Sequence, residues 1–192
     1  MKKYLIGASA AAVLALTTAC GTGDTSAVDS SRSTPPTAAG EAQQSSHNDS
    51  DIAFAQQMIP HHEQAVEMAD LALERSTDPN VESLAEQITG SQDPEIQQMT
   101  GLLKKWGAPA APDKSDMPGM MSGEEMRQLE QATGSEFDVM WLQMMIQHHQ
   151  GAIELAKTEL KEGSDADAKA LAQRIIEAQD AEIREMVGLL PH

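Results

Sequence analysis

Pairs of adjacent histidines stand in the middle of a helical pattern at two places in the sequence. His61 and His62 lie in the stretch MIPHHEQAVEMA, and His148 and His149 lie in the stretch MIQHHQGAIELA. A helix that packs against its neighbours normally buries leucine at such positions, because an imidazole buried without a partner costs free energy. Imidazole is also a common ligand of transition metals, so the pairs indicate either a hydrogen-bonded core or a metal site.

The two stretches belong to an internal duplication. A shift of 87 residues aligns 51–103 with 138–190 without a gap, and 22 of the 53 aligned positions are identical. Each copy predicts two helices, which in the first copy run over 51–75 and 79–105 with a turn between them. Alternation of β-branched or aromatic residues is scarce, which argues against strands. We therefore expect an all-α fold, a ferritin-like four-helix bundle over residues 49–192 built from two duplicated hairpins.

The helical period places both histidines of each pair beside the apolar stripe. On the second helix of the hairpin it turns Glu95 inward and Asp93 outward, whereas Glu67 on the first helix faces solvent. A hairpin folded at about residue 77 brings the inward polar and sulfur-bearing side chains to one level. In the first copy this level holds Met58, His61, His62, Gln92, Glu95 and Met99, and in the second copy it holds Met145, His148, His149, Gln179, Glu182 and Met186.

A methionine-rich linker, 107–135, joins the two copies. Its second half predicts a short helix that begins with a capping box formed by Ser122 and Glu125. Its first half predicts a loop over one end of the bundle. Because a loop has little core to fill, its thioethers are harder to explain by packing than those of the helices. These loop methionines are Met117, Met120 and Met121.

A mixture of imidazole and thioether without thiolate suits copper. Sulfur favours Cu(I) or Ag(I), nitrogen favours Cu(II), and zinc or iron fits this ligand mixture less well. The alternative is a histidine hydrogen-bonded within the core and methionines that only fill space. The candidate metal ligands are His61, His62, His148, His149, Met58, Met145, Met99, Met186, Glu95, Glu182, Met117, Met120 and Met121.

The first 48 residues have the composition of an export signal and a tether. Residues 1–20 carry two lysines, an apolar run and small residues that end in Cys20, the only cysteine, so no internal disulfide can form. The surroundings of Cys20 resemble a bacterial lipobox, although Thr17 replaces the usual leucine, and plain secretion is the alternative. Residues 21–48 are rich in Gly, Ser, Thr, Ala and Pro, which predicts a disordered tether. We expect a lipid anchor on Cys20 that holds an exported protein at the outer face of the bacterial cytoplasmic membrane, in the periplasm or at the cell surface.

The charge of the chain excludes some partners. The formal net charge is −17, and removal of the signal leaves 11 basic and 30 acidic residues, or −19. Nucleic acid and anionic lipid surfaces would be repelled, whereas cations would be attracted.

Several motifs of this sequence resemble those of the bacterial domain of unknown function 305 family. They are D-x-x-F-x-x-x-M-I-x-H-H-x-x-A-x-x-M-A in the first copy, its counterpart in the second copy, Q-x-x-E-I-x-x-M in both halves, and MPGMM in the linker. The resemblance covers residues 49–190 and implies a ferritin-like fold. Members of that family include CopM-like exported copper-binding proteins, which implies that the four histidines and nearby methionines are ligands. One departure is internal, since Leu155 stands where the first copy has Met68.

Three functions follow as hypotheses. The first is an extracytoplasmic copper-binding lipoprotein that buffers, sequesters or hands on the ion to a transfer partner, as a monomer or a homo-oligomer. The second is a ferritin-like di-metal enzyme, although the E-x-x-H pairs of carboxylate di-iron proteins are absent from the sequence. The third is a structural or partner-binding lipoprotein whose polar layer sets the register of the bundle without metal.

Overall fold

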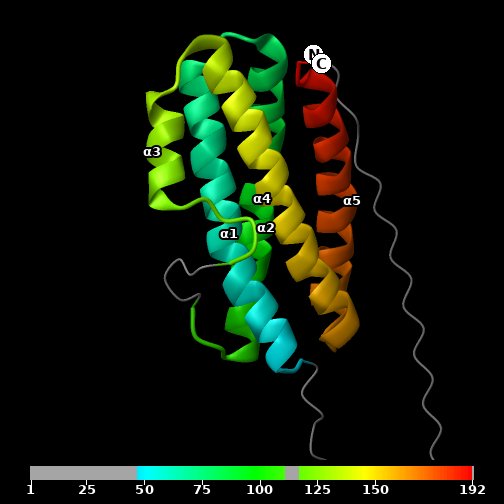
Figure 1. The fold of residues 1–192 in the computed structure, drawn as a ribbon. Coiled ribbons are helices and arrows are strands. Elements are labelled where there is room, and N and C mark those ends of the chain that lie inside the picture. The colour runs from blue at the N-terminus through cyan, green and yellow to red at the C-terminus, as the bar shows by residue number, and fades with distance from the viewer. Residues whose placement is uncertain (1–46, 111–116, 192) are drawn as a thin grey trace, which may run out of the picture. The chain divides into compact units, whose positions relative to one another are not determined.

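The computed structural model describes residues 47–110 and 117–191, and the predicted signal, Cys20 and nearly all of the predicted tether lie outside the described residues. The described residues form an all-α fold, in which four long helices build a bundle and a short fifth helix lies in the linker (Figure 1). The helices are α1 (Asp49–Arg75), α2 (Pro79–Trp106), α3 (Gly123–Gln131), α4 (Gly134–Glu162) and α5 (Ala166–Leu189). The predicted four-helix bundle is confirmed.

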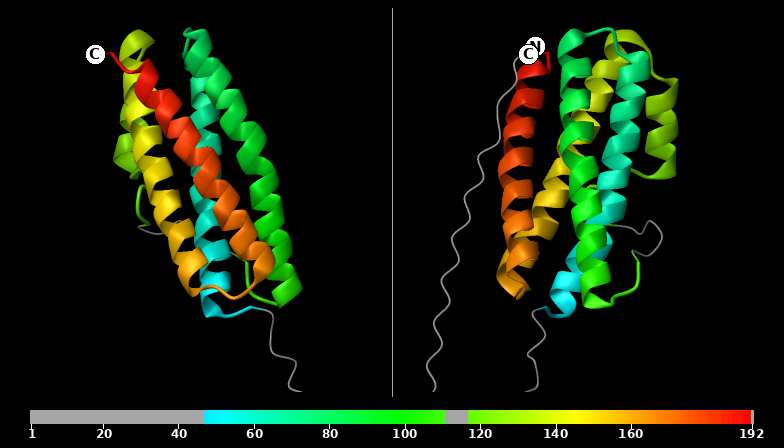
Figure 2. Two further views of the ribbon diagram at one scale, coloured as in Figure 1. Left: turned by 90° about the vertical axis from the view of Figure 1, so that its right-hand side faces the viewer. Right: turned by 180° about the vertical axis from the view of Figure 1, so that it is seen from behind.

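The bundle consists of two antiparallel hairpins. Helices α1 and α2 pack along each other, as do α4 and α5, and the two hairpins meet mainly through α1 and α4. Figure 2 shows the hairpins from two further sides. Helix α2 ends beside the start of α1, whereas α4 starts at the opposite end of the bundle (Figure 1). The connection between the copies therefore has to return along the length of the bundle, which explains why the linker is long.

Local sequence signals set the helix boundaries. Asn48 caps α1 through the backbone amides of Ser50 and Asp51, and Asp78 caps α2, which has a proline in its first turn. The capping box of Ser122 and Glu125 at the start of α3 is present as expected. Both α1 and α2 continue through an internal proline.

An aspartate near the start of each first helix ties the two hairpins together. Asp51 on α1 accepts hydrogen bonds from the Ser164 and Asp165 amides in the turn between α4 and α5, at 3.0 and 2.9 Å. Its counterpart Asp138 on α4 accepts one from the Ser76 hydroxyl in the turn between α1 and α2, at 2.6 Å. The duplication thus repeats one cross-hairpin contact in both directions, which fixes the height of one hairpin against the other.

The core is divided into two apolar clusters. One cluster includes Leu84, Phe137 and Trp141, and the other includes Phe54 and Leu171. The residues between them are buried but polar, so the bundle has a polar layer at mid-height. Among the residues that the structure describes, no helix has the length and apolar character needed to cross a membrane.

Candidate metal-binding layer

The polar layer is built around the four histidines of the two HH pairs. Each ring is fully buried, with an exposed fraction of at most 1%. The first helix of each hairpin supplies one pair, from a position near its middle, because the apolar stripe of α1 and α4 runs beside both rings. The inward orientation expected from the helical period is what the structure has.

His61 and His148 meet where the two hairpins touch. Their ring centroids lie 3.9 Å apart, with an angle of 49° between the ring planes. Burial lowers the pKa of His61 to about 3, and burial together with the neighbouring histidines holds the pKa of His148 well below its ordinary value. Both rings are therefore neutral at neutral pH, which is the form that binds metal.

The other two histidines pair with glutamates from the second helix of the same hairpin. His62 Nε2 lies 2.8 Å from Glu95 Oε2, and His149 Nε2 lies 2.6 Å from Glu182 Oε2. A carboxylate oxygen only accepts, so each ring donates its Nε2–H, and in the neutral form of the ring the lone pair is on Nδ1. The predicted inward orientation of Glu95 and Glu182 agrees with these bonds, which orient the rings rather than leaving the carboxylates unpaired.

Several buried polar atoms in this layer have no hydrogen-bond partner within the described residues. They include Nδ1 of all four histidines and, for His148, Nε2 as well. The side-chain amide of Gln92 is buried without a partner, and so is the amide oxygen of Gln179. An unpaired buried polar atom costs free energy, so this concentration needs an explanation, and a bound ion would satisfy the lone pairs on nitrogen.

Methionine side chains lie on both sides of the polar layer. Met58 and Met99 belong to one apolar cluster, and Met145 and Met186 belong to the other. All four are fully buried. The two copies thus place their methionines in opposite clusters, as a twofold arrangement of the hairpins requires.

The linker methionines do not lie where the sequence analysis placed them. The segment 117–121 crosses the middle of the bundle beside the histidines, so the expectation of a loop over one end of the bundle is wrong. Pro118 O lies 3.0 Å from His61 Nε2, and Met121 is hydrogen-bonded to Gln64 through both its N–H and its C=O. Met117 and Met121 are buried, and Met120 is half-buried. The loop reaches this height because the connection has to return along the bundle.

Gln64 and Gly151 are site residues that the sequence analysis missed. They occupy matched positions of the duplication, and both contact the segment 117–121. The sequence carries one signal for them: two positions after the HH pair, the first copy has glutamine and the second copy has glycine.

The donor set fits a soft or borderline metal better than a hard one. In the described ranges, 47–110 and 117–191, no group of three or more His, Cys, Asp or Glu side chains is arranged to hold a metal ion. The glutamates of the layer are engaged by histidine, so the groups left over are imidazole nitrogens and thioethers. A mixed nitrogen and sulfur set is the one that copper prefers.

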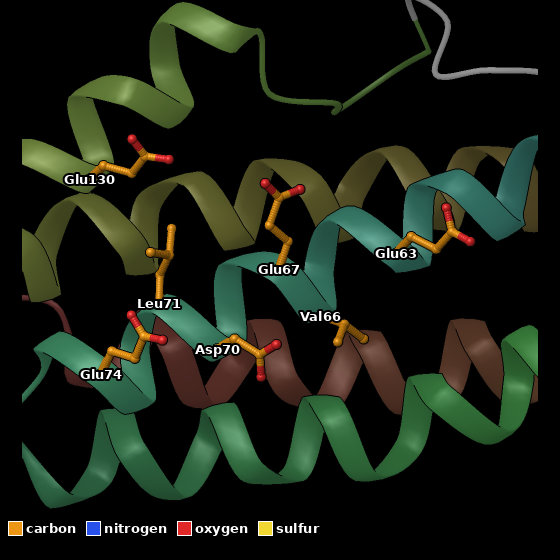
Figure 3. Close-up of a pocket in the computed structure, with 7 residues that line it drawn as sticks. All are labelled: Glu63, Val66, Glu67, Asp70, Leu71, Glu74 and Glu130. Atoms are coloured by element: carbon orange, nitrogen blue, oxygen red, sulfur yellow. The ribbon is translucent and has the colours of Figure 1, made fainter.

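An acidic pocket of about 380 Å³ lies on the outer face of α1 (Figure 3). Four of its carboxylates come from α1 and a fifth comes from α3, around the apolar side chains of Val66 and Leu71. Such a concentration of carboxylates attracts cations to this face of the bundle. The acidic lining residues are Glu63, Glu67, Asp70, Glu74 and Glu130.

Comparison with known proteins gives one family and several solved structures. The model of a family described as domain of unknown function (DUF305) matches residues 51–190. A DUF305 protein of Streptomyces coelicolor, described as secreted, is 35% identical, with a TM-score of 0.69 over 73% of this chain and 89% of that one. A DUF305 fragment from Deinococcus radiodurans is 34% identical, with a TM-score of 0.70 over 74% of this chain and 95% of that one. Among curated proteins, none matches.

A further similar structure is that of CopM. Its Cu(I)-bound form is 30% identical to this chain, with a TM-score of 0.64 over 72% of this chain and 93% of CopM. CopM has also been solved in Cu(II)-bound, silver-bound and apo forms, all with the same fold as the bundle described above.

Proposed function

The chain belongs to the DUF305 family, and from that premise we propose that it is an exported copper-binding protein that buffers, sequesters or hands on the ion. The polar layer is the binding site in this proposal, with copper as cargo. His61, His62, His148 and His149 supply nitrogen ligands, and the flanking methionines supply sulfur. The copper-bound and silver-bound forms of CopM support the choice of metal, because CopM shares this fold.

The observation that carries the proposal is the set of unpaired Nδ1 atoms on four buried imidazoles. Three of the four rings donate Nε2–H to a fixed acceptor, which is Glu95, Glu182 or the Pro118 carbonyl. Each such bond leaves the Nδ1 lone pair available for an ion. The lone pairs are unengaged before an ion arrives, and the side chains must move together to bind one, because no three His, Cys, Asp or Glu side chains among the described residues are arranged to hold an ion.

The sulfur ligands of the proposal are Met58, Met99, Met145 and Met186 in the bundle, with Met117, Met120 and Met121 on the linker. Thioethers favour Cu(I) and Ag(I), whereas imidazoles accept Cu(II) too. A protein with both donors can hold copper through a change of oxidation state. Glu95 and Glu182 serve as partners of the histidine ligands.

Metal titration tests the proposal. Purified protein is titrated with Cu(I) and with Cu(II) against a competing chelator, and the same titration is run on a variant in which all four layer histidines are alanine. His47→Ala is the matched control, because His47 stacks on Trp106 away from the layer. We expect sub-micromolar binding in the wild type and the control, and its loss in the fourfold variant. Binding no tighter than micromolar in the wild type, or binding unchanged in the fourfold variant, would overturn the proposal.

A lipid anchor on Cys20 and a tether over residues 21–48 complete the proposal for the exported chain. The anchor would hold the protein at the outer face of the membrane, where incoming copper passes. Cys20→Ser tests this point: the variant should appear in the soluble fraction, whereas the wild type should remain with membranes and incorporate labelled fatty acid. Soluble wild-type protein without label would show plain secretion instead.

A second candidate function rests on the two His–Glu pairs. Each pair joins the two helices of one hairpin by a hydrogen bond, which would set the register of that hairpin without a metal. Melting curves separate the two functions, because a ligand that binds only the folded state raises the melting temperature. A melting temperature unchanged by any transition metal would favour the structural role.

A further inference from the structure

Gln64 holds the linker segment 117–121 against α1. Its side-chain oxygen accepts a hydrogen bond from the Met121 amide at 2.7 Å, and its side-chain nitrogen donates one to the Met121 carbonyl at 2.9 Å. Both groups of one backbone residue are therefore satisfied by one buried side chain, whose exposed fraction is 4%. A buried backbone group that loses its partner is costly, so this pair of bonds is a strong local restraint.

On the other side, the segment lies flat on α4 because two glycines meet. Gly119 has a φ of +80°, and a Cβ atom there would lie 2.7 Å from the Gln147 carbonyl oxygen. A Cβ atom on Gly151 would lie 2.0 Å from the Pro118 carbonyl oxygen. Neither position tolerates a side chain while the segment stays in place.

The two repeats thus treat one position in opposite ways. The first copy has Gln64 there, which hydrogen-bonds the segment, and the second copy has Gly151, whose lack of a side chain allows the segment to approach α4 closely. The segment covers the junction of α1 and α4, where His61 and His148 meet, and it supplies the carbonyl that holds His61 Nε2–H. His148, the counterpart of His61 in the second copy, has no such hydrogen bond.

We propose that Gln64 and Gly151 are positioning residues that seat the methionine segment 117–121 across the histidine layer, so that copper enters and leaves when this segment lifts. The inference deepens the proposed function and rests on it for the role of copper. The seating itself is a property of the metal-free protein. Met117, Met120 and Met121 move with the segment, so the same motion that opens the layer carries three sulfur atoms to the outside.

Hydrogen exchange of the metal-free protein tests the seating. Gln64→Leu keeps the size of the side chain and removes both bonds, and we expect the amide of Met121 and its neighbours to exchange at least tenfold faster. Gly151→Ala should have the same effect, because its methyl group displaces the Pro118 carbonyl. The matched controls are Gln150→Leu, on the exposed face of α4, and Gly188→Ala, where an added Cβ has no neighbour within 4 Å. Helical Gly→Ala changes otherwise stabilise, so a looser segment in Gly151→Ala points to the contact.

Copper release tests the gating. Copper-loaded protein is mixed with an excess of Cu(I) chelator, and transfer is followed by absorbance in stopped flow. Gln64→Leu and Gly151→Ala should release copper at least tenfold faster than the wild type, and both controls should match the wild type. Circular dichroism of each variant confirms that the bundle is intact.

The outcomes separate this inference from the proposed function. Exchange of 117–121 unchanged by Gln64→Leu and Gly151→Ala would overturn the seating, whether or not copper binds. Faster exchange with unchanged copper release would overturn the gating. Failure of the wild type to bind copper would overturn the proposed function and the gating with it, whereas the exchange experiment would still decide the seating.

Discussion

His61 and His148 occupy the same position in the two halves of the duplication, and their rings pack 3.9 Å apart in the interior of the bundle. A contact between equivalent residues lies on the pseudo-twofold axis of the two hairpins, so the two copies contact each other here through the same residue. Two positive charges at that separation and in that environment would repel strongly. The neutrality of both rings is therefore a condition for the hairpins to pack.

Acid should destabilise the metal-free protein through this pair. An unfolded histidine has its ordinary pKa of about 6.5, whereas His61 in the bundle has a pKa of about 3. Between these values the unfolded chain binds a proton that the folded chain does not, so the contribution of this pair to stability is intact above pH 6.5 and is lost as the pH drops towards 3. Each such histidine contributes at most about 1.4 kcal/mol per pH unit. Urea unfolding at pH 7, 5.5 and 4.5 measures the fall.

Variants of His61 and His148 show whether the loss of stability in acid comes from these two imidazole rings. His61→Leu with His148→Leu removes both titrating groups from the layer, so the loss of stability between pH 6.5 and 4.5 should shrink relative to the wild type. His47→Ala should keep the wild-type slope. An unchanged slope in the double variant would contradict the assignment.

The glutamate partners of His62 and His149 should tune copper affinity. Glu95→Gln and Glu182→Gln keep the shape of the side chain but weaken the acceptor of the Nε2–H bond, which lowers the electron density on Nδ1. Loss of such a partner typically reduces metal affinity about 10-fold to 100-fold. Competition titration with Cu(II) measures the change.

Charge alone must be excluded as the cause of that change. Glu154→Gln removes one negative charge from the exposed face of α4, without a contact to the layer, and should bind copper as the wild type does. A loss of affinity in Glu154→Gln equal to that in Glu182→Gln would mean that the net charge, rather than the His–Glu bond, sets the affinity.

The helical period accounts for most of the fold and for the four buried histidines. Strong apolar stripes and capping residues fix the helices to within a few residues, and the duplication fixes their pairing. The angle of Glu95 on its helix alone predicts that it faces inward, and the fold of the hairpin near residue 77 brings it to the level of His62. These features depend on local sequence, which is why they could be predicted.

The position of the linker methionines could not be predicted in the same way. Met121 lies beside the histidines because of the Gln64 side chain and the close approach of Gly119 to Gly151, and neither contact has a periodic signal in the sequence. The role of Asp51 was also missed, since its partners Ser164 and Asp165 are more than a hundred residues away. Contacts between irregular segments and helices depend on the assembled tertiary structure.

The two cross-hairpin aspartates should differ in their contribution to stability. Asp51 is fully buried and accepts bonds from two amides of the opposite turn and from the Ser164 hydroxyl, whereas Asp138 is partly exposed. Asp51→Ala leaves buried amides without an acceptor and should cost roughly 2–4 kcal/mol. Asp138→Ala should cost about 1 kcal/mol. Equal losses of unfolding free energy in the two variants, measured by thermal unfolding, would contradict this prediction and show that the two contacts contribute equally to stability.

Glu159, on α4 near the Asp51 contact, should make the protein less stable as the pH rises from about 4.5 to about 8. Glu159 is 1% exposed, and its carboxyl group lies beside the carboxylate of Asp51, to which it can donate a hydrogen bond when protonated. Burial and the neighbouring Asp51 raise its pKa to about 8, with Asp165 acting in the same direction and Lys169 against it. Between its ordinary value near 4.5 and about 8, the folded chain holds a proton that the unfolded chain has lost, so this group lowers stability as the pH rises through that range.

A neutral isostere isolates this contribution from those of the other titrating groups. Glu159→Gln keeps the shape of the side chain and cannot ionise, so its stability relative to the wild type should grow from pH 4.5 to about 8 and then level off. Glu162→Gln, on the exposed face one turn later, is the control and should show no such trend. Urea unfolding of the three proteins from pH 5 to 9 measures the differences. A Glu159→Gln advantage that stays constant over this range would mean that the buried carboxyl group is already ionised at pH 5, and that the Asp51 contact tolerates its charge.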